Sequence, residues 1–232
     1  MKRFYKDVTV EPAAGGFGLR LDGRVVKTPA RAALEVPNPA LAEAIAGEWR
    51  AQGDKVDPRS MPLTGLANAA IDRVAADVQA FAAGLALFGE TDLVCYRAEA
   101  PDRLVSRQGE AWDPLVKWAR RRYDIELKVA KGVMHHAQPA QTVTRLASAV
   151  SARGPFELAG LSPLVTVSGS LVIALAVAEG AFPLAEAWAA ASVEEQWQID
   201  EWGDDAEAVA ALAARRRDFE AGASFLEQLR GR

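Results

Sequence analysis

The sequence has one cysteine, Cys95, and two histidines, which are adjacent at His135 and His136. A single cysteine excludes an internal disulfide and fits a reducing compartment. Adjacent histidines face different directions, and because no HExxH or CxxC spacing is present, no metal site is recognisable. The glycines of AAGGFG match neither GxGxxG nor the P-loop spacing, so no phosphate-binding loop is indicated. We expect no metal, no cofactor and no bound nucleotide.

A net positive charge and long apolar runs are also missing. The net charge of −4 argues against nucleic acid as a partner, because phosphate binding needs a basic face. The most apolar run, Leu171–Ala178, is much shorter than the roughly 20 residues that cross a bilayer, so we expect no membrane insertion. The opening MKRFYKDVTV lacks the apolar core of a signal peptide and the Arg- and Ser-rich character of an organelle leader. These features predict a soluble, cytoplasmic protein.

Residues 1–61 predict a β-rich N-terminal domain with one packed helix. Asp22-Gly23 is a typical type I′ hairpin turn between short runs of strand-forming residues. Asn38 then caps a helix with Pro39 at its first position, and Gly53 ends it. The proline-bearing loop GDKVDPRSMP follows, and we place the domain boundary there.

Residues 62–232 predict a larger, all-α C-terminal domain, so the expected fold class is α+β with two domains. Helical patterns recur from Thr64 onward, and the segment LVIALAVAEG is apolar almost all round. Such a helix belongs at the buried centre of a bundle.

The stretch Pro183–Gly203 predicts one helix with marked ends, a proline at its start and a glycine just past its end. On a period of 3.6 residues, one stripe contains two indoles with a carboxylate and an amide between them: Trp188, Ala191, Glu195, Gln198 and Trp202. The segment from Glu194 to Glu207 carries seven acidic residues and no Lys or Arg, and Asp200 is one of the seven. Two interpretations remain open: a core helix with a solvated charged face, or a docking surface for a protein partner.

Seven stretches, taken together and in order, resemble the assembly chaperones that bind the α subunit of the catalytic sector of F-type ATP synthase. They are RFYKDVTV, LDGRVVKTP, LAEAIAGEWRAQ, MPLTGLANAAID, TDLVCYRAEAPDRLVSRQGEAWDPLVKW, SGSLVIALAVAEG and VEEQWQIDEWG. The resemblance implies a non-enzymatic chaperone that shields an unassembled α subunit until a β subunit replaces it. Its charged helix motif falls on Glu194, Glu195, Gln198, Trp202 and Gly203, with Trp197 where a smaller aromatic is usual. Mitochondrial members carry an N-terminal extension that this sequence lacks, which favours a bacterial, cytoplasmic member over one of the mitochondrial matrix.

The expected partner-binding residues are therefore Trp188, Glu194, Glu195, Gln198, Asp200 and Trp202. An alternative hypothesis is a small-molecule enzyme with a site between the two domains and Glu195 as general acid or base. The missing nucleophile, cofactor loop and metal ligands weigh against it. The sequence thus predicts a binding protein and not an enzyme.

Overall fold

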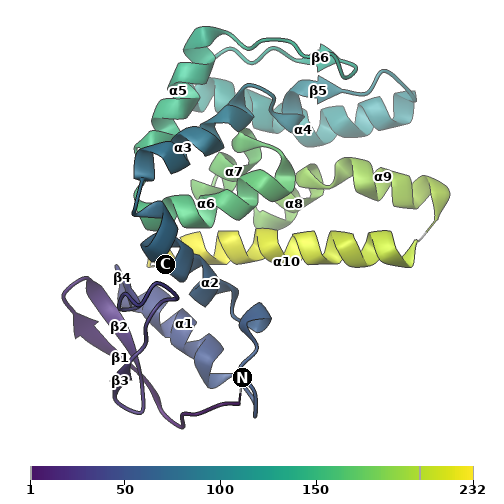
Figure 1. Ribbon diagram of the computed structural model, residues 1–232. Helices are drawn as coiled ribbons and strands as arrows, with labels where there is room; N and C mark the ends of the chain where they lie inside the picture. Colours follow the sequence, from purple (N-terminus) through teal and green to yellow (C-terminus); the bar gives the residue numbers. More distant parts are fainter. Residues whose placement is uncertain (1, 204, 232) are drawn as a thin grey trace. The chain divides into compact units, whose positions relative to one another are not determined.

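A computed structural model describes residues 2–203 and 205–231. Its contacts divide the chain into two compact units. Unit 1 comprises residues 1–78, 154–160 and 224–232, and unit 2 comprises residues 79–153 and 161–223. A small N-terminal sheet precedes a larger helical part (Figure 1), which confirms the predicted α+β fold class.

Unit 1 begins with an antiparallel sheet of β1 (Val8–Ala13), β2 (Gly16–Leu21), β3 (Arg24–Val25) and β4 (Glu35–Val36), in which both β1 and β3 pair with β2. β4 also pairs with β2, at Phe17 and Gly18. The turn between β2 and β3 has Asp22 at φ 48° and Gly23 at φ 78°. Both central residues of a type I′ turn need positive φ, so the predicted hairpin is confirmed.

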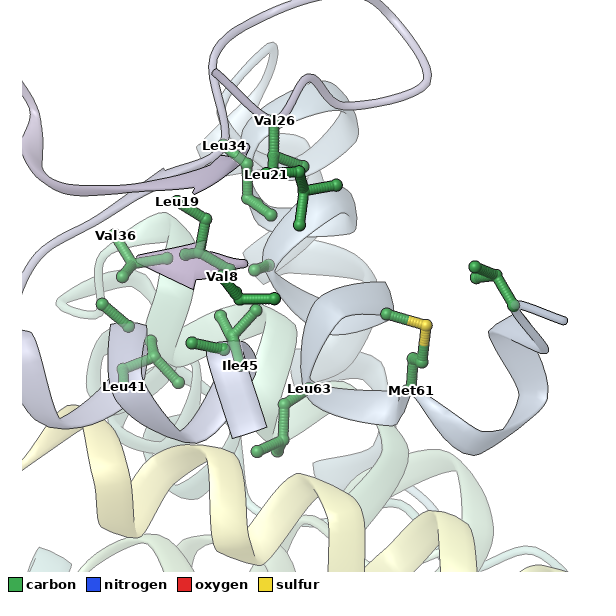
Figure 2. Packing of buried hydrophobic residues seen from close by; sticks show 14 of the residues in the cluster. Val8, Leu19, Leu21, Val26, Leu34, Val36, Leu41, Ile45, Met61 and Leu63 are labelled. Atoms are coloured by element: carbon green, nitrogen blue, oxygen red, sulfur yellow. The ribbon is translucent and has the colours of Figure 1, made fainter. Parts of the chain in front are cut away.

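The helix α1 (Pro39–Arg50) packs on this sheet. The side chain of Asn38 accepts a hydrogen bond from Leu41 N at 2.9 Å, which confirms the predicted cap. Val8 and Leu19 from the sheet gather with Ile45 of α1 in the core of unit 1 (Figure 2). Alternation along the strands and a 3.6-residue period along the helix place these apolar side chains on the facing surfaces.

Unit 1 is larger than the predicted domain of residues 1–61. The 3-10 helix η1 (Pro58–Ser60) leads into α2 (Pro62–Ala69) and a π-helical segment, η2 (Ala70–Val74). Met61 and Leu63 are buried in the same core as the sheet. The Glu48 carboxylate of α1 accepts hydrogen bonds from Leu63 N (2.7 Å) and Thr64 N (2.8 Å), so it satisfies the free N–H groups at the start of α2. The position of a boundary between independently folding domains stays a prediction.

Unit 2 begins within α3 (Val78–Ala86). The 3-10 helices η3 (Leu87–Gly89) and η4 (Leu93–Cys95) follow, and then β5 (Tyr96–Arg97), which pairs in parallel with β6 (Ala130–Lys131). The helical pattern that recurs from Thr64 onward is therefore divided first among α2, η2 and α3. The described residues hold one stretch, Val78–Cys95, with the length and apolar composition of a membrane span, with a mean hydropathy of 1.3. The structure divides this stretch among three short helices, and core segments of globular proteins have the same composition.

The remaining elements are long and short helices. They are α4 (Asp102–Tyr123), α5 (Ala140–Ser151), α6 (Pro155–Ser168), α7 (Leu171–Ala178), α8 (Leu184–Ala191), α9 (Val193–Trp202) and α10 (Ala206–Leu229). Every residue of α7 is buried, as the sequence predicts, and α4 and α8 both pack on it. The fully buried Trp112 of α4 donates its indole N–H to Ala190 O at 2.8 Å, which ties α4 to the end of α8.

The buried carboxylate of Asp92 caps two helices at once. It accepts hydrogen bonds from Val94 N in η4 (3.2 Å), from the Ser170 hydroxyl (2.5 Å) and from Val172 N at the start of α7 (2.9 Å). The first N–H groups of a helix lack partners within the helix, and α7 begins where water cannot supply them. Asp92 therefore makes it possible to bury the start of α7.

We expect Asp92→Ala to lower the free energy of unfolding of the chain by about 3 kcal/mol, because buried donors lose their acceptor. Denaturant unfolding followed by tryptophan fluorescence measures this, since five of the six tryptophans lie in unit 2. Asp218→Ala, at an exposed position of α10, is the control and should change stability by less than about 0.5 kcal/mol. Equal stability of the two variants would contradict the role given to Asp92.

Asp92 also makes stability depend on pH. Burial raises the pKa of its carboxyl from 3.8 to about 6, against the opposing effect of its hydrogen bonds. The folded chain holds this proton more tightly than the unfolded chain, so the carboxyl's contribution to stability falls as pH rises from 4 to 6. Lowering the pH from 7 to 4 should therefore stabilise the wild type relative to Asp92→Asn by about 3 kcal/mol. If the unfolding free energies of the wild type and Asp92→Asn changed equally between pH 7 and pH 4, the prediction would be contradicted.

Candidate partner-binding surface on α9 and α10

The predicted single helix from Pro183 to Gly203 is wrong, because the structure breaks it at Ser192. The backbone there has φ −121° and ψ 19°, and the Ser192 hydroxyl donates to Trp188 O at 2.8 Å. A side chain that bonds a carbonyl of the preceding turn competes with continuation of the helix. Two helices result, α8 and α9, with different surroundings.

The break separates Trp188 from the other predicted site residues. Trp188 is only 8% exposed and its ring lies 5.5 Å from that of Phe219 in α10, whereas Trp202 is 74% exposed. The expectation that Trp188 and Trp202 share one face is therefore wrong. Trp188 is a buried residue of the core, and a part for it in partner binding stays a prediction.

Most of the acidic side chains of α9 already have partners within unit 2. Glu195 forms an ion pair with Arg215 of α10, and both side chains remain more than a third exposed. Asp200 accepts a hydrogen bond from Arg107 of α4 at 2.6 Å, which holds the pKa of its carboxyl below the ordinary value. Because these charges are paired, α9 is less negative toward solvent than the sequence implies.

Glu194 has a structural position. Its carboxylate accepts a hydrogen bond from the side-chain amide of Gln108 at 2.7 Å, and the same amide accepts one from Ala98 N at 2.7 Å. Burial, with the adjacent carboxylate of Glu195, raises the pKa of Glu194. Gln108 is fully buried, so this chain of hydrogen bonds connects the start of α9 to α4 and to the end of β5.

The far end of α9 carries an aromatic pair, in which Trp197 is half-buried and Trp202 is exposed. The rings of Trp197 and Trp202 lie 5.5 Å apart in an edge-to-face arrangement. The indole nitrogen of Trp197 is buried and has no hydrogen-bond partner within the described part of the chain. Gly203 follows with φ 87° and ψ 173°, a conformation that side-chain-bearing residues avoid, and it ends α9 before α10 begins (Figure 1).

Between these two helices lies a hollow of about 480 Å³, here called the α9–α10 groove. Both helices contribute side chains, and apolar ones predominate. The lining residues are Glu195, Gln198, Ile199, Trp202, Gly203, Asp205, Ala208, Ala211, Leu212 and Arg215. Three of the predicted site residues, Glu195, Gln198 and Trp202, thus line this groove, while Glu194 and Asp200 lie on the same helix outside its lining.

Sequence reasoning missed the contribution of α10. Residues 206–213 read AEAVAALA, yet seven of the eight are exposed and only Leu212 is half-buried. A helical stretch with so few polar residues is ordinarily covered by other elements. Exposed apolar surface next to an exposed tryptophan is typical of a protein-binding site. The low polarity of AEAVAALA was the available signal, but the sequence does not reveal that this stretch is exposed.

The described residues that line the groove include no His or Cys. Among residues 2–203 and 205–231, no cluster of three His, Cys, Asp or Glu side chains could hold a metal ion. The one thiol, Cys95, is buried, and burial together with the carboxylate of Asp92 raises its pKa to about 12. A thiol with such a pKa is protonated near neutral pH and is a poor nucleophile.

Comparisons with known proteins agree with a binding role. Residues 2–120 match the family described as ATP12 chaperone protein. The chain is 39% identical to Atp12 from Paracoccus denitrificans, covering 98% of each chain with a TM-score of 0.94. It is 41% identical to the Atu1473 protein from Agrobacterium tumefaciens, covering 98% of this chain and 86% of that one, again with a TM-score of 0.94. It is 26% identical to the mitochondrial protein atp12 of Schizosaccharomyces pombe, over 87% of this chain and 74% of that protein.

These likenesses identify the class of protein as an assembly chaperone. The chain belongs to the ATP12 chaperone family, which acts in the assembly of ATP synthase. The family predicted from the sequence is therefore confirmed. The α subunit as the bound partner, and the residues that bind it, stay predictions.

The half-exposed ion pair of Glu195 leads to a prediction about stability. An exposed pair contributes about 1 kcal/mol or less, so Glu195→Lys should leave unit 2 folded, with a loss of about 1 kcal/mol in unfolding free energy. Exchanging the two charges in Glu195→Arg/Arg215→Glu should recover most of that loss. Thermal and denaturant unfolding measure both variants. A loss of several kcal/mol in the single variant would show that Glu195 is a buried structural residue instead.

Proposed function

We propose that the chain binds an unassembled α subunit of the ATP synthase catalytic sector and covers its subunit interface until a β subunit replaces it. The observation that carries this proposal is the exposed apolar surface of the α9–α10 groove, next to Trp202. Subunits awaiting assembly expose interfaces that are more apolar than ordinary surface, and a chaperone must cover them reversibly. The family's role in ATP synthase assembly supports a subunit of that enzyme as the partner.

The proposed binding residues are Glu195, Gln198 and Trp202, joined by the α10 residues that line the groove. Trp202 provides a large, rigid contact surface of the kind that dominates binding energies. Glu195 and Asp200 are paired with Arg215 and Arg107, so their part in binding is to hold α9 in place.

We further propose that this chaperone acts without catalysis and without nucleotide. Glu195, the candidate acid or base of the enzymatic alternative, is paired with Arg215 and lies beside an apolar groove. The greater identity to relatives from Paracoccus and Agrobacterium than to the mitochondrial relative supports the bacterial cytoplasm as its compartment.

The test is suppression of aggregation of a purified α subunit diluted out of denaturant. An equimolar amount of the wild-type chain should keep the α subunit in solution, and added β subunit should displace the chain. Ala211→Trp fills the groove with an indole and should weaken binding about 30-fold, equivalent to about 2 kcal/mol.

The matched control is Ala210→Trp, which places the same side chain at an adjacent exposed position that does not line the groove. It should protect the α subunit as well as the wild type does. Equal protection of a purified β subunit, or no protection of the α subunit, would refute the proposal.

A further inference from the structure

The lining of the α9–α10 groove has the spacing of a helix-binding site. α9 contributes Glu195, Gln198, Ile199 and Trp202, and α10 contributes Ala208, Ala211, Leu212 and Arg215. Each set falls at positions i, i+3, i+4 and i+7, which is one face of two helical turns. At 1.5 Å per residue the two faces are about 10 Å long. The groove therefore has the form of a short helical bundle from which one helix is missing.

The backbone of the groove walls determines which kind of segment can fill it. Residues within α9 and α10 use their backbone N–H and C=O groups inside their own helices, so the walls offer no free edge for a strand. An extended segment lying in an apolar groove would bury its own backbone groups without partners, at considerable cost. A helix satisfies its backbone internally and can bury an apolar face there.

The side chains set the shape of the partner. Ala208 and Ala211 are small, so a helix can approach α10 closely, while Ile199 and Leu212 present apolar surface. The exposed ring of Trp202 stands at the end of the groove nearest the turn between α9 and α10. The matching partner face is a stripe of aliphatic side chains at helical spacing.

The charges of the groove determine which charge the partner should carry. At one end of the groove, Glu195 and Arg215 neutralise each other. At the other end, Asp205 lines the groove and Glu207 is exposed beside it, and residues 194–207 contain no Lys or Arg. A basic side chain on the partner would complement this acidic end, whereas an acidic one would be repelled.

We propose that the α9–α10 groove binds a short amphipathic helix of the client, about two turns long. Aliphatic residues of that helix enter the groove, and a Lys or Arg at one end lies beside Asp205 and Glu207. This inference rests on the proposed function for the identity of the client, the α subunit, and adds the form and charge of the bound segment.

Site-specific photocrosslinking with purified α subunit tests the proposal. A benzophenone amino acid is placed at Ala211 of α10 or at Gln198 of α9, on the two sides of the groove. The crosslinked client residues should fall in one segment at separations of three, four or seven positions, with a basic residue at its end. The same probe at Ala213, exposed but outside the groove lining, should give at least about tenfold less product.

A charge reversal in α10 tests whether the bound segment carries a basic residue. Glu207→Lys should weaken binding of the α subunit at low ionic strength, and the difference from wild type should shrink as salt is added. Asp218→Lys, an equal change of charge at another exposed position of α10, should bind like the wild type.

Three results would overturn the inference. They are crosslinks at alternate residues of an extended segment, crosslinks as abundant from Ala213 as from Ala211, and stronger binding by Glu207→Lys. If any of these appeared while the wild-type chain still suppressed aggregation, the bound helix would be wrong and the proposed function would stand. If the wild-type chain gave no suppression, the proposed function would fail, and this inference with it.

Discussion

A helix that is apolar on every side must be covered on every side, and α7 imposes this requirement on unit 2. α4 and α8 pack against it, and Asp92 supplies the hydrogen-bond acceptor that its first turn cannot find in water. The indole of Trp112 then holds the last turn of α8 against α4. The positions of α4 and α8 follow from the burial of α7, and the start of α9 follows from them.

The core ends abruptly at Ser192, and the character of the chain changes there. Before the break, α8 buries Ala187, Trp188, Ala190 and Ala191. After it, α9 buries only Val193 and is held through polar contacts, from Glu194 to Gln108 and from Asp200 to Arg107. Polar contacts hold a helix in place without using its apolar side chains. Ile199 and Trp202 consequently remain available to line the groove shared with α10.

Local signals predicted much of the fold. The Asp22-Gly23 turn, the Asn38 cap and the buried α7 are each encoded within a few residues and appear as expected. The break at Ser192 could not be predicted in this way, because the residues around it are good helix formers. It accompanies distant packing, of Trp188 on Phe219 and of Trp112 on the end of α8.

The same limit applies to the candidate site and to the extent of unit 1. The ion pair between Glu195 and Arg215 joins two helices, and the sequence shows acidic and basic runs without saying that they pair. In unit 1, the side chain of Asn38 donates to Leu229 O at 2.6 Å, across 191 positions of sequence. Neither contact produces a periodic pattern in the sequence. A domain boundary or a surface charge that is predicted from local composition therefore omits such contacts.

The break at Ser192 also separates residues that evolve under different constraints. The buried residues of α8 before it are fixed by the interior of unit 2, so a substitution there changes the folded state of the chain itself. The exposed residues after it, along α9 and the first turns of α10, make few contacts that the fold requires. On the proposed function, mutations can accumulate on this surface in step with changes in a partner while the core stays intact. Recognition of the client could then change without a new fold.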